Sequence, residues 1–247
     1  MGIMICSFGA SRNNMSAKVA VIFWASGTEI DGSKKNRPTW FSKKKCFKSC
    51  YESAKLAGMD FYLFYDGEQN HYLDYIQSHN ISGFRNVHNH HGGKTFVNMI
   101  SFLYEIKNEY THFYIAEDDH MYVPHAFKFL QGAINTIGSN AVFSCFEHGR
   151  RYEVTDDITK GDEQIIISKD CHWRTSESTT ASFCIDKNIL EKYETFITSL
   201  ADREIFRELY RNGVRLWTPI PSLSTHMINS DMAHFVNWKE INSKIIL

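Results

Sequence analysis

Hydrophobic residues along the chain alternate between short uninterrupted runs and longer stretches with helical spacing. The runs Lys18 to Ala25 (KVAVIFWA) and Asp60 to Tyr65 (DFYLFY) are rich in β-branched and aromatic residues, and each is followed by a turn that contains glycine. Such runs are typical of buried strands. Between them, Phe41 to Ala57 carries apolar residues at helical spacing and lysines on another face, which predicts an amphipathic helix. The start of the chain therefore predicts a β-α-β unit.

The same alternation continues towards the end of the chain. We predict further strands at His112 to Ala116, Ala141 to Phe146, Gln164 to Ser168 and Arg215 to Thr218, and further helices at Thr95 to Lys107, Lys187 to Leu200 and Arg203 to Arg211. Alternating strands and helices predict an α/β fold with a mostly parallel central sheet flanked by helices. Because no repeat or interior linker interrupts the pattern, we expect a single domain over residues 15–247. Residues 1–14 are expected to be a disordered or non-native extension.

Composition and charge narrow the class of protein. The chain has 247 residues, of which 43% are hydrophobic and 22% charged, enough for one sizeable core. A net charge of -1 gives no general attraction to nucleic acid or to an anionic membrane. The six cysteines are scattered, so free thiols are expected. The first residues lack the basic segment and long apolar run of a signal peptide or membrane anchor. A cytoplasmic protein without membrane contact is the resulting expectation.

Three consecutive acids, Glu117, Asp118 and Asp119, follow the predicted strand at His112 to Ala116. Open α/β sheets bind ligands at the carboxyl ends of their strands. Acids at the end of a buried strand repel one another and lose solvation, and a bound divalent cation would compensate for both. Oxygen ligands favour Mg²⁺ or Mn²⁺, either of which can grip a diphosphate. The alternative is an exposed acidic turn that caps the next helix.

A second group of features lies near the C-terminal end. Asp202 precedes Gly213 by eleven residues, with apolar residues at helical spacing between them, and His226 follows that glycine by thirteen. A carboxylate at a helix N-terminus could accept a proton from an acceptor hydroxyl. A neutral imidazole could complete the coordination of a metal ion. The structural alternatives are an ordinary helix cap for Asp202 and a buried histidine for His226.

These segments resemble those of a known enzyme family. IAEDDHMYVPHAFKFL is similar to the metal-site segment of GT-A glycosyltransferases, and ADREIFRELYRNGVRLWTPIPSLSTH, continuing into MINS, resembles their base helix and C-terminal histidine. The match is strong at Phe113 to Leu130 and Asp202 to Ser230, and covers Lys18 to His234 more loosely. The resemblance implies a GT-A, Rossmann-like fold with a small subregion on the acceptor side. It also implies transfer of a sugar, hexosyl or pentosyl, from a nucleoside-diphosphate donor that is UDP-linked, with Mn²⁺ or Mg²⁺ as cofactor.

The resemblance also implies roles for individual residues. Asp119 and His226 would bind the metal ion, while Glu117 and Asp118 would contact the ribose, the sugar or nearby water. Asp202 would be the catalytic base of an inverting transfer. The family often has Glu just before this Asp, where the present chain has alanine. Glu204 is therefore a second candidate for the base.

Further donor and acceptor contacts are implied by position. Asp66 ends a predicted strand, where related enzymes read the nucleobase or ribose, although the ordinary turn role of an Asp-Gly pair explains it better. Gly93 and Lys94 resemble the glycine-bearing loop over the nucleotide, with the lysine able to meet a phosphate. Arg37 could reach the diphosphate or could simply be solvated. Trp173 could stack on a sugar in the acceptor pocket or belong to the core.

A basic stretch allows two alternatives for the acceptor of the sugar. Between residues 34 and 48 there are seven Lys or Arg residues and no acid. Lys44, Lys45 and Lys48 could follow a phosphate backbone. The acceptor would then be a hydroxymethylated DNA base, as in phage enzymes that glycosylate such bases. A viral enzyme of this kind would act in the host cytoplasm. The alternative is that these lysines form the solvated face of a helix, in which case the acceptor is a glycan.

Two other classes of protein are alternatives to a glycosyltransferase. A nucleotidyltransferase shares the α/β sheet and the metal-binding acids but acts on a nucleoside triphosphate. It would need a glycine-rich basic signature after the first strand, of which WASGTEIDGSKK is a poor version. A catalytically inactive module that binds a sugar or nucleic acid would bind a donor without releasing its nucleotide.

Overall fold

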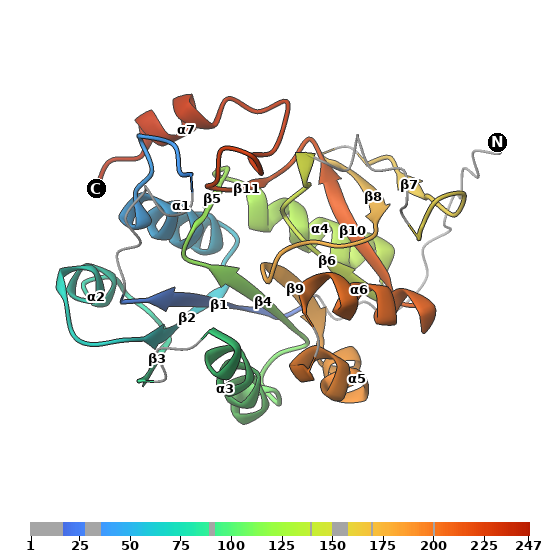
Figure 1. Ribbon diagram of the computed structural model, residues 1–247, viewed down its shortest axis with the longest axis horizontal. Helices are drawn as coiled ribbons and strands as arrows, with labels where there is room; N and C mark the ends of the chain where they lie inside the picture. Colours follow the sequence, from blue (N-terminus) through green and yellow to red (C-terminus); the bar gives the residue numbers. More distant parts are fainter. Residues whose placement is uncertain are drawn as a thin grey trace.

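The computed structural model describes residues 17–27, 36–88, 92–138, 140–149, 158–168, 170–199 and 201–247. The extension expected at residues 1–14 lies outside this part of the chain. The main sheet comprises β1 (Val19–Ser26), β2 (Asp60–Asp66), β3 (Gly83–Val87), β4 (His112–Glu117), β6 (Ala141–Phe143), β7 (Ile165–Ile166), β8 (His172–Ser176), β9 (Phe183–Asp186) and β10 (Arg215–Ile220). Their order is β3-β2-β1-β4-β9-β6-β10-β8-β7, and Figure 1 shows β1 and β4 near the middle of the molecule.

Most of the sheet is parallel, as the sequence predicts. Strands β1, β2, β3 and β4 run in one direction, and β6 runs parallel to β10. Strand β9 is antiparallel to both β4 and β6, and β8 is antiparallel to both β10 and β7. Two strands therefore run against the other seven. The prediction of an α/β fold with a mostly parallel central sheet is confirmed.

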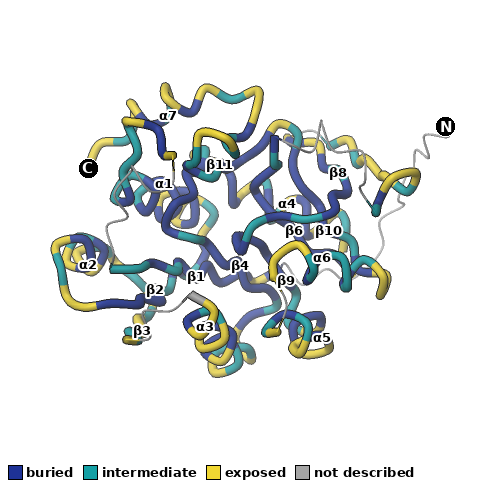
Figure 2. The backbone as a smooth tube through the Cα atoms, in the orientation of Figure 1, coloured by how far each residue is buried: buried dark blue, intermediate teal, exposed yellow. Residues whose placement is uncertain are grey.

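Helices cover both faces of the sheet, so its central strands are buried on both sides. The hydrophobic side chains of α1 (Lys43–Leu56), α2 (His71–Gln77) and α4 (Ala126–Ile137) pack on one face, and those of α3 (Gly92–Ile106), α5 (Lys187–Ser199) and α6 (Asp202–Arg211) pack on the other. Figure 2 shows the central strands as buried and the outward sides of the helices as exposed. None of the described helices combines the length and hydrophobicity that a membrane crossing requires.

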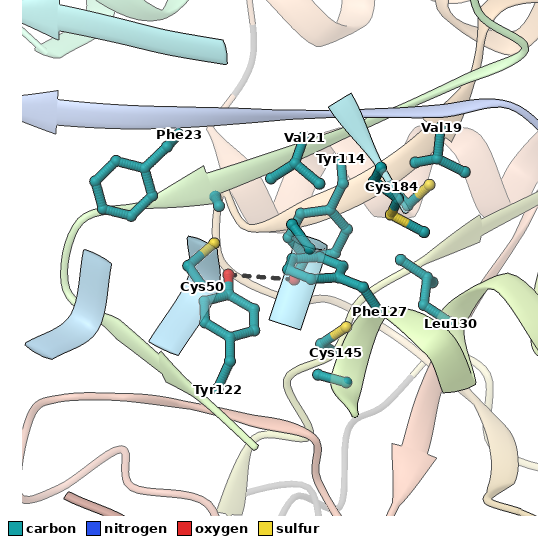
Figure 3. Close-up of a cluster of buried hydrophobic side chains, with 14 of the residues drawn as sticks. Val19, Val21, Phe23, Cys50, Tyr114, Tyr122, Phe127, Leu130, Cys145 and Cys184 are labelled. Atoms are coloured by element: carbon teal, nitrogen blue, oxygen red, sulfur yellow. Dashed lines mark hydrogen bonds between the residues drawn. The ribbon is translucent and has the colours of Figure 1, made fainter. Parts of the chain in front are cut away.

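Buried side chains from β1, β4, α1 and α4 pack together as a core on this face of the sheet (Figure 3). The ring of Tyr114, on β4, meets that of Phe127 edge-on at a centroid distance of 4.8 Å. The Tyr122 hydroxyl donates a hydrogen bond of 3.4 Å to that of Tyr114. Cys50 and Cys145 lie in the same cluster, and the five described cysteines are all buried free thiols. This agrees with the expectation from their scattered positions.

A second, small sheet lies beyond the end of β4. It joins β5 (His120–Tyr122) to β11 (Ser224–His226) in antiparallel register. Met121 in β5 and Met227, the residue after β11, pack with Phe146 and with Trp238, which begins α7 (Trp238–Lys244). Figure 1 shows α7 beside α1, far along the chain from it. The small sheet thus fixes the C-terminal region against the turn that carries the acidic triplet.

Candidate functional site

The pairing of β5 with β11 brings together residues that lie far apart in the sequence. In this register His226 stands opposite His120, and the Met227 N–H donates a 2.9 Å hydrogen bond to the Asp119 carbonyl. The His226 Nε2 atom lies 3.3 Å from Asp119 Oδ2. The structure therefore places His226 and Asp119, the two metal ligands expected from the sequence, side by side.

Asp119 is surrounded by nitrogen atoms. It is 6% exposed, and Arg37 Nη2 donates a 2.8 Å hydrogen bond to the same oxygen, Oδ2, that His226 approaches. Burial alone would raise the pKa of Asp119. The hydrogen bond from His226, the charge of His226 when it is protonated, and the guanidinium of Arg37 outweigh burial and hold this pKa well below its usual range. Asp119 is therefore a carboxylate at neutral pH.

His120 joins this pair, although the sequence analysis did not single it out. Its side chain is fully enclosed, and its ring stacks on that of His226 with centroids 5.1 Å apart and planes 10° from parallel. Burial, followed by the charge of His226, lowers the pKa of His120 to about 3, so the imidazole is neutral. The only sequence signal was its position directly after the acidic triplet.

The donor set of these three residues fits a divalent cation. One ligand atom from each of Asp119, His120 and His226 lies within 4.8 Å of the other two. Within the part of the chain that the structure describes, His120 Nδ1 is a buried atom without a hydrogen-bond partner, which leaves it available to a ligand. A mixed oxygen and nitrogen set suits Mn²⁺ better than Mg²⁺, which prefers oxygen ligands alone.

The Asp118 carboxylate contacts different residues from those that contact Asp119. Its Oδ2 accepts 2.8 Å from Lys43 Nζ and 3.0 Å from the Ser26 backbone N–H. Lys43 also donates 3.0 Å to the Ser26 carbonyl. Burial raises the pKa of Asp118 and the neighbouring Asp119 adds to this, while Lys43 acts against it. Asp118 thus links the end of β1 to the start of α1, and Lys43 is a site residue that the sequence analysis missed.

Glu117 is the most accessible acid of the triplet. Its side chain is 27% exposed, and the Ser182 hydroxyl donates to its Oε2 at 3.3 Å. Burial, then the negative charges of Asp119 and Asp202, raise the pKa of Glu117 to about 8. A carboxyl group in this state can exchange a proton near neutral pH.

Asp202 lies within electrostatic reach of this centre. Its charge raises the pKa of Glu117, and His226 in turn lowers that of Asp202. Asp202 is the first residue of α6, and Ala201 rather than Asp202 occupies the cap position. Although the residue as a whole is exposed, burial of its carboxyl group raises its pKa above the usual value, against the effects of its own backbone N–H and of His226. The helix ends before Gly213, whose φ of 81° suits glycine.

Glu204, the second candidate for the base, belongs to a surface ion pair. Its side chain is 47% exposed and lies 3.2 Å from Arg207 one turn further along α6. Arg207 and Arg203 also contact Glu177, a buried carboxylate in the loop after β8. The loop therefore holds the helix that carries Asp202.

Three of the predicted donor contacts, Asp66, Gly93 and Lys94, lie beside the end of β2. Asp66, buried at the end of that strand, accepts a hydrogen bond from the Thr95 hydroxyl in the first turn of α3. Helix α3 begins at Gly92, three residues before the predicted start. Gly93 and Lys94 therefore lie in its first turn, where both are exposed. The hydrogen bond places all four residues at the junction of β2 and α3.

Two other predicted site residues are buried within the protein. The Arg37 side chain is 1% exposed and bound to Asp119, so it is not solvated, and its contact with a diphosphate stays a prediction. Trp173 is 2% exposed and packs edge-on against Phe143 with centroids 5.9 Å apart. It belongs to the core, one of the two alternatives that its sequence position left open.

The basic stretch is partly used within the protein. Lys44 Nζ lies 5.3 Å from the centre of the Tyr75 ring, Lys45 donates 2.8 Å to the Asn242 carbonyl near the end of α7, and Lys48 pairs with Glu52. Residues 34 and 35 lie outside the described part of the chain. Each of the three lysines proposed to contact DNA already has a partner.

Comparisons with known proteins show what the fold is similar to. No family model and no curated protein sequence matches the chain. Among solved structures, it is similar to CMP:2-keto-3-deoxy-manno-octonic acid synthetase complexed with CTP, at 9% identity and a TM-score of 0.51 over 92% of this chain and 98% of that one. It is also similar to residues 1–349 of TarS from S. aureus, at 10% identity and a TM-score of 0.50, over 81% of this chain and 57% of that one.

A third similar structure is the inositol-1-phosphate CTP transferase from T. maritima, at 13% identity and a TM-score of 0.49 over 93% of this chain and 96% of that one. At such low identity, structural likeness is evidence of fold and not of activity. The fold is thus an α/β fold of the type found in GT-A enzymes and nucleotidyltransferases.

Proposed function

We propose that the protein is a metal-dependent glycosyltransferase that moves a sugar from a nucleoside-diphosphate donor, UDP-linked, to a hydroxyl group. The pairing of β5 with β11 carries this proposal, because it brings His226 to 3.3 Å from Asp119. The charge of Asp202 raises the pKa of Glu117, and His226 lowers the pKa of Asp202. This coupling between the proposed metal ligands and the proposed base, which come from three separate segments of the chain, supports one shared site.

The proposed roles follow from the chemistry of the side chains. Asp119 and His226, with His120 beside them, would hold Mn²⁺, and a bound divalent cation stabilises the charge that grows on a departing diphosphate. Asp202 would accept the proton of the acceptor hydroxyl in an inverting transfer. Its raised pKa suits this role, because a stronger base removes a proton more effectively as long as it stays ionised at the working pH.

The junction of β2 and α3 supports a donor site. The fifteen-residue helix α3 begins at this junction, and the N-terminus of a helix attracts phosphate. Lys94 in its first turn would add a positive charge. Asp66, held by Thr95, would contact the ribose or the base, and Glu117 and Asp118 would face the ribose and sugar. Gly93 would let the backbone approach the nucleotide closely.

A nucleotidyltransferase is the second candidate. The structural match to a synthetase complexed with CTP, which spans 92% of this chain and 98% of the other, favours it. The two reactions differ in their products: a glycosyltransferase releases a nucleoside diphosphate from a nucleotide-sugar, whereas a nucleotidyltransferase releases pyrophosphate from a triphosphate.

Product release tests the proposal. The protein is incubated with MnCl₂ and a panel of nucleotide-sugars, and separately with CTP or UTP and sugar phosphates. Slow metal-dependent UDP release from one UDP-sugar, lost in Asp119→Asn and retained in Glu208→Gln at the far end of α6, is expected. Pyrophosphate release instead would favour the nucleotidyltransferase. Binding detected by thermal shift without either product would favour an inactive module.

The acceptor is a glycan or a modified DNA base. The intramolecular partners of Lys44, Lys45 and Lys48 support the glycan, because these lysines would have to give up contacts to meet a phosphate backbone. Retention on a DNA column that weakens with salt, and that is lost when all three become glutamine, would instead support DNA.

A further inference from the structure

Arg37 is built into the protein interior beside the proposed metal ligand. Its Nη2 donates to Asp119 Oδ2 at 2.8 Å, and its Nη1 donates to the Met227 carbonyl at 3.0 Å. Its guanidinium carbon lies 4.4 Å from the centre of the Phe41 ring. These contacts come from the acidic turn, from the residue after β11 and from the segment before α1. Arg37 is therefore fixed in place and not a surface side chain that meets Asp119 by chance.

Two of the three acids of the triplet each have a buried cationic partner. A buried carboxylate needs a counter-charge to remain ionised. Lys43 supplies one to Asp118 at 2.8 Å, and Arg37 supplies one to Asp119, with the two side chains only 1% and 8% exposed. Because a cation already binds the carboxylate, the site can fold without a metal ion. A divalent ion that binds Asp119 would meet a positive charge on the same oxygen.

We infer that Arg37 is a built-in counter-ion of Asp119 that competes with the divalent cation of the proposed function. Arg37 stabilises the site when no metal is bound and lowers the affinity of Asp119 for the metal. This inference rests on the proposed function, since it requires Asp119 to bind a metal ion. It goes further by assigning to Arg37 control over how tightly that ion is held.

A competing role and a purely structural role for Arg37 predict opposite changes in metal affinity when Arg37 is removed. If Arg37 only oriented Asp119, its removal would lower protein stability with or without metal, and would weaken metal binding. If Arg37 competes with the metal, its removal lowers the stability of the metal-free protein most, because the cation can replace the lost charge. Linkage then requires that the metal binds the variant more tightly than the wild type.

The experiment compares Arg37→Met with the wild type, by thermal unfolding in EDTA and in saturating MnCl₂ and by calorimetric titration with MnCl₂. Arg174→Met is the matched control, because Arg174 also pairs with a buried acid, Glu147, away from the proposed metal ligands. We expect Arg37→Met to lower the midpoint by about 6 °C or more in EDTA and by less than half as much in MnCl₂. Its Mn²⁺ affinity should rise about tenfold or more, because two cations at one carboxylate repel each other. Arg174→Met should lower the unfolding midpoint by the same amount in EDTA and in MnCl₂.

The outcomes separate the inference from the function on which it rests. Equal losses for Arg37→Met in EDTA and MnCl₂, or weaker Mn²⁺ binding, would overturn the inference while leaving the metal site intact. If MnCl₂ does not raise the unfolding midpoint of even the wild type, both the metal dependence of the proposed function and the inference are refuted. Should Arg37→Met fail to fold in both conditions, Arg37→Gln decides by titration, since it removes the charge but keeps a donor for the Met227 carbonyl. Tighter Mn²⁺ binding than wild type supports the inference, and equal or weaker binding refutes it.

Discussion

Glu177 ties the helix of the proposed base to the rest of the site, and its replacement by glutamine is a direct test of that tie. The carboxylate side chain is 7% exposed. It accepts hydrogen bonds from Arg203 Nη2 at 3.1 Å and from Arg207 Nε at 2.6 Å, both on α6. Further along the same loop, the Thr180 hydroxyl lies 3.2 Å from His120 Nε2. The loop therefore joins α6 to the metal-ligand group.

The magnitude follows from the exposure of the partners. Removing one member of a fully buried ion pair costs about 3–5 kcal/mol. Arg203 is 47% exposed, so its share is at most about 1 kcal/mol. Arg207 is 19% exposed and keeps a second partner in Glu204 at 3.2 Å, which reduces the loss further. We therefore expect Glu177→Gln to lower the free energy of unfolding by about 2 kcal/mol.

Urea denaturation measures this loss. With a slope of about 2–3 kcal/mol per molar urea, the midpoint should fall by about 0.7–1 M while the slope itself stays constant. Glu204→Gln is the control, because it breaks one exposed pair on the same helix and should cost less than about 0.5 kcal/mol. A midpoint for Glu177→Gln equal to that of Glu204→Gln would refute the idea that Glu177 anchors α6.

The remaining predictions concern the proposed base and the core. Asp202→Asn should reduce sugar transfer by about 100-fold or more while nucleotide-sugar binding by thermal shift is unchanged, and full activity would move the assignment to Glu204. Because the pKa of Asp202 is raised, its carboxylate is lost as pH falls through that folded-state value, so kcat should decline on the acid side at a higher pH than for an ordinary aspartate. A rate that stays flat down to about pH 4 would contradict this. Trp173→Ala should cost about 3–5 kcal/mol of stability and leave the Mn²⁺-dependent thermal shift unchanged, whereas a small cost would return Trp173 to the acceptor pocket.

The fold could be predicted because its central strands carry strong local patterns. Strands β1, β2 and β4 are buried on both faces, so each is a continuous apolar run that contrasts with the amphipathic helices between them. The shorter elements could not be found in this way. Strands β5 and β11 have three residues each and helix α2 has seven, too few for a period to stand out. Antiparallel β8 and β9 are set by tertiary pairing, which local sequence does not reveal.

The proximity of Asp119 and His226 was predictable from two segments, far apart in the chain, that resemble motifs of one enzyme family. Asp119 and His226 were identified from segments around residues 118 and 226, and the structure brings them together. Lys43 was not identified, and Arg37 was identified only as a candidate contact of the diphosphate, because in the sequence both belong to a basic stretch that is typical of a solvated helix face. Only the packed structure shows that both enter the interior and neutralise acids from a different part of the chain. His120 was missed because its partner becomes visible only in the register of β5 with β11.

The central claim is that Asp119 and His226 hold one divalent cation next to the proposed base. Anomalous diffraction from crystals soaked in MnCl₂ and UDP tests it most directly. We expect a single manganese peak within bonding distance of an Asp119 carboxylate oxygen and of a ring nitrogen of His226, with the diphosphate on the ion and the Asp202 carboxylate facing the site. A manganese peak bound elsewhere, with Asp119 still held by Arg37 alone, would contradict the account.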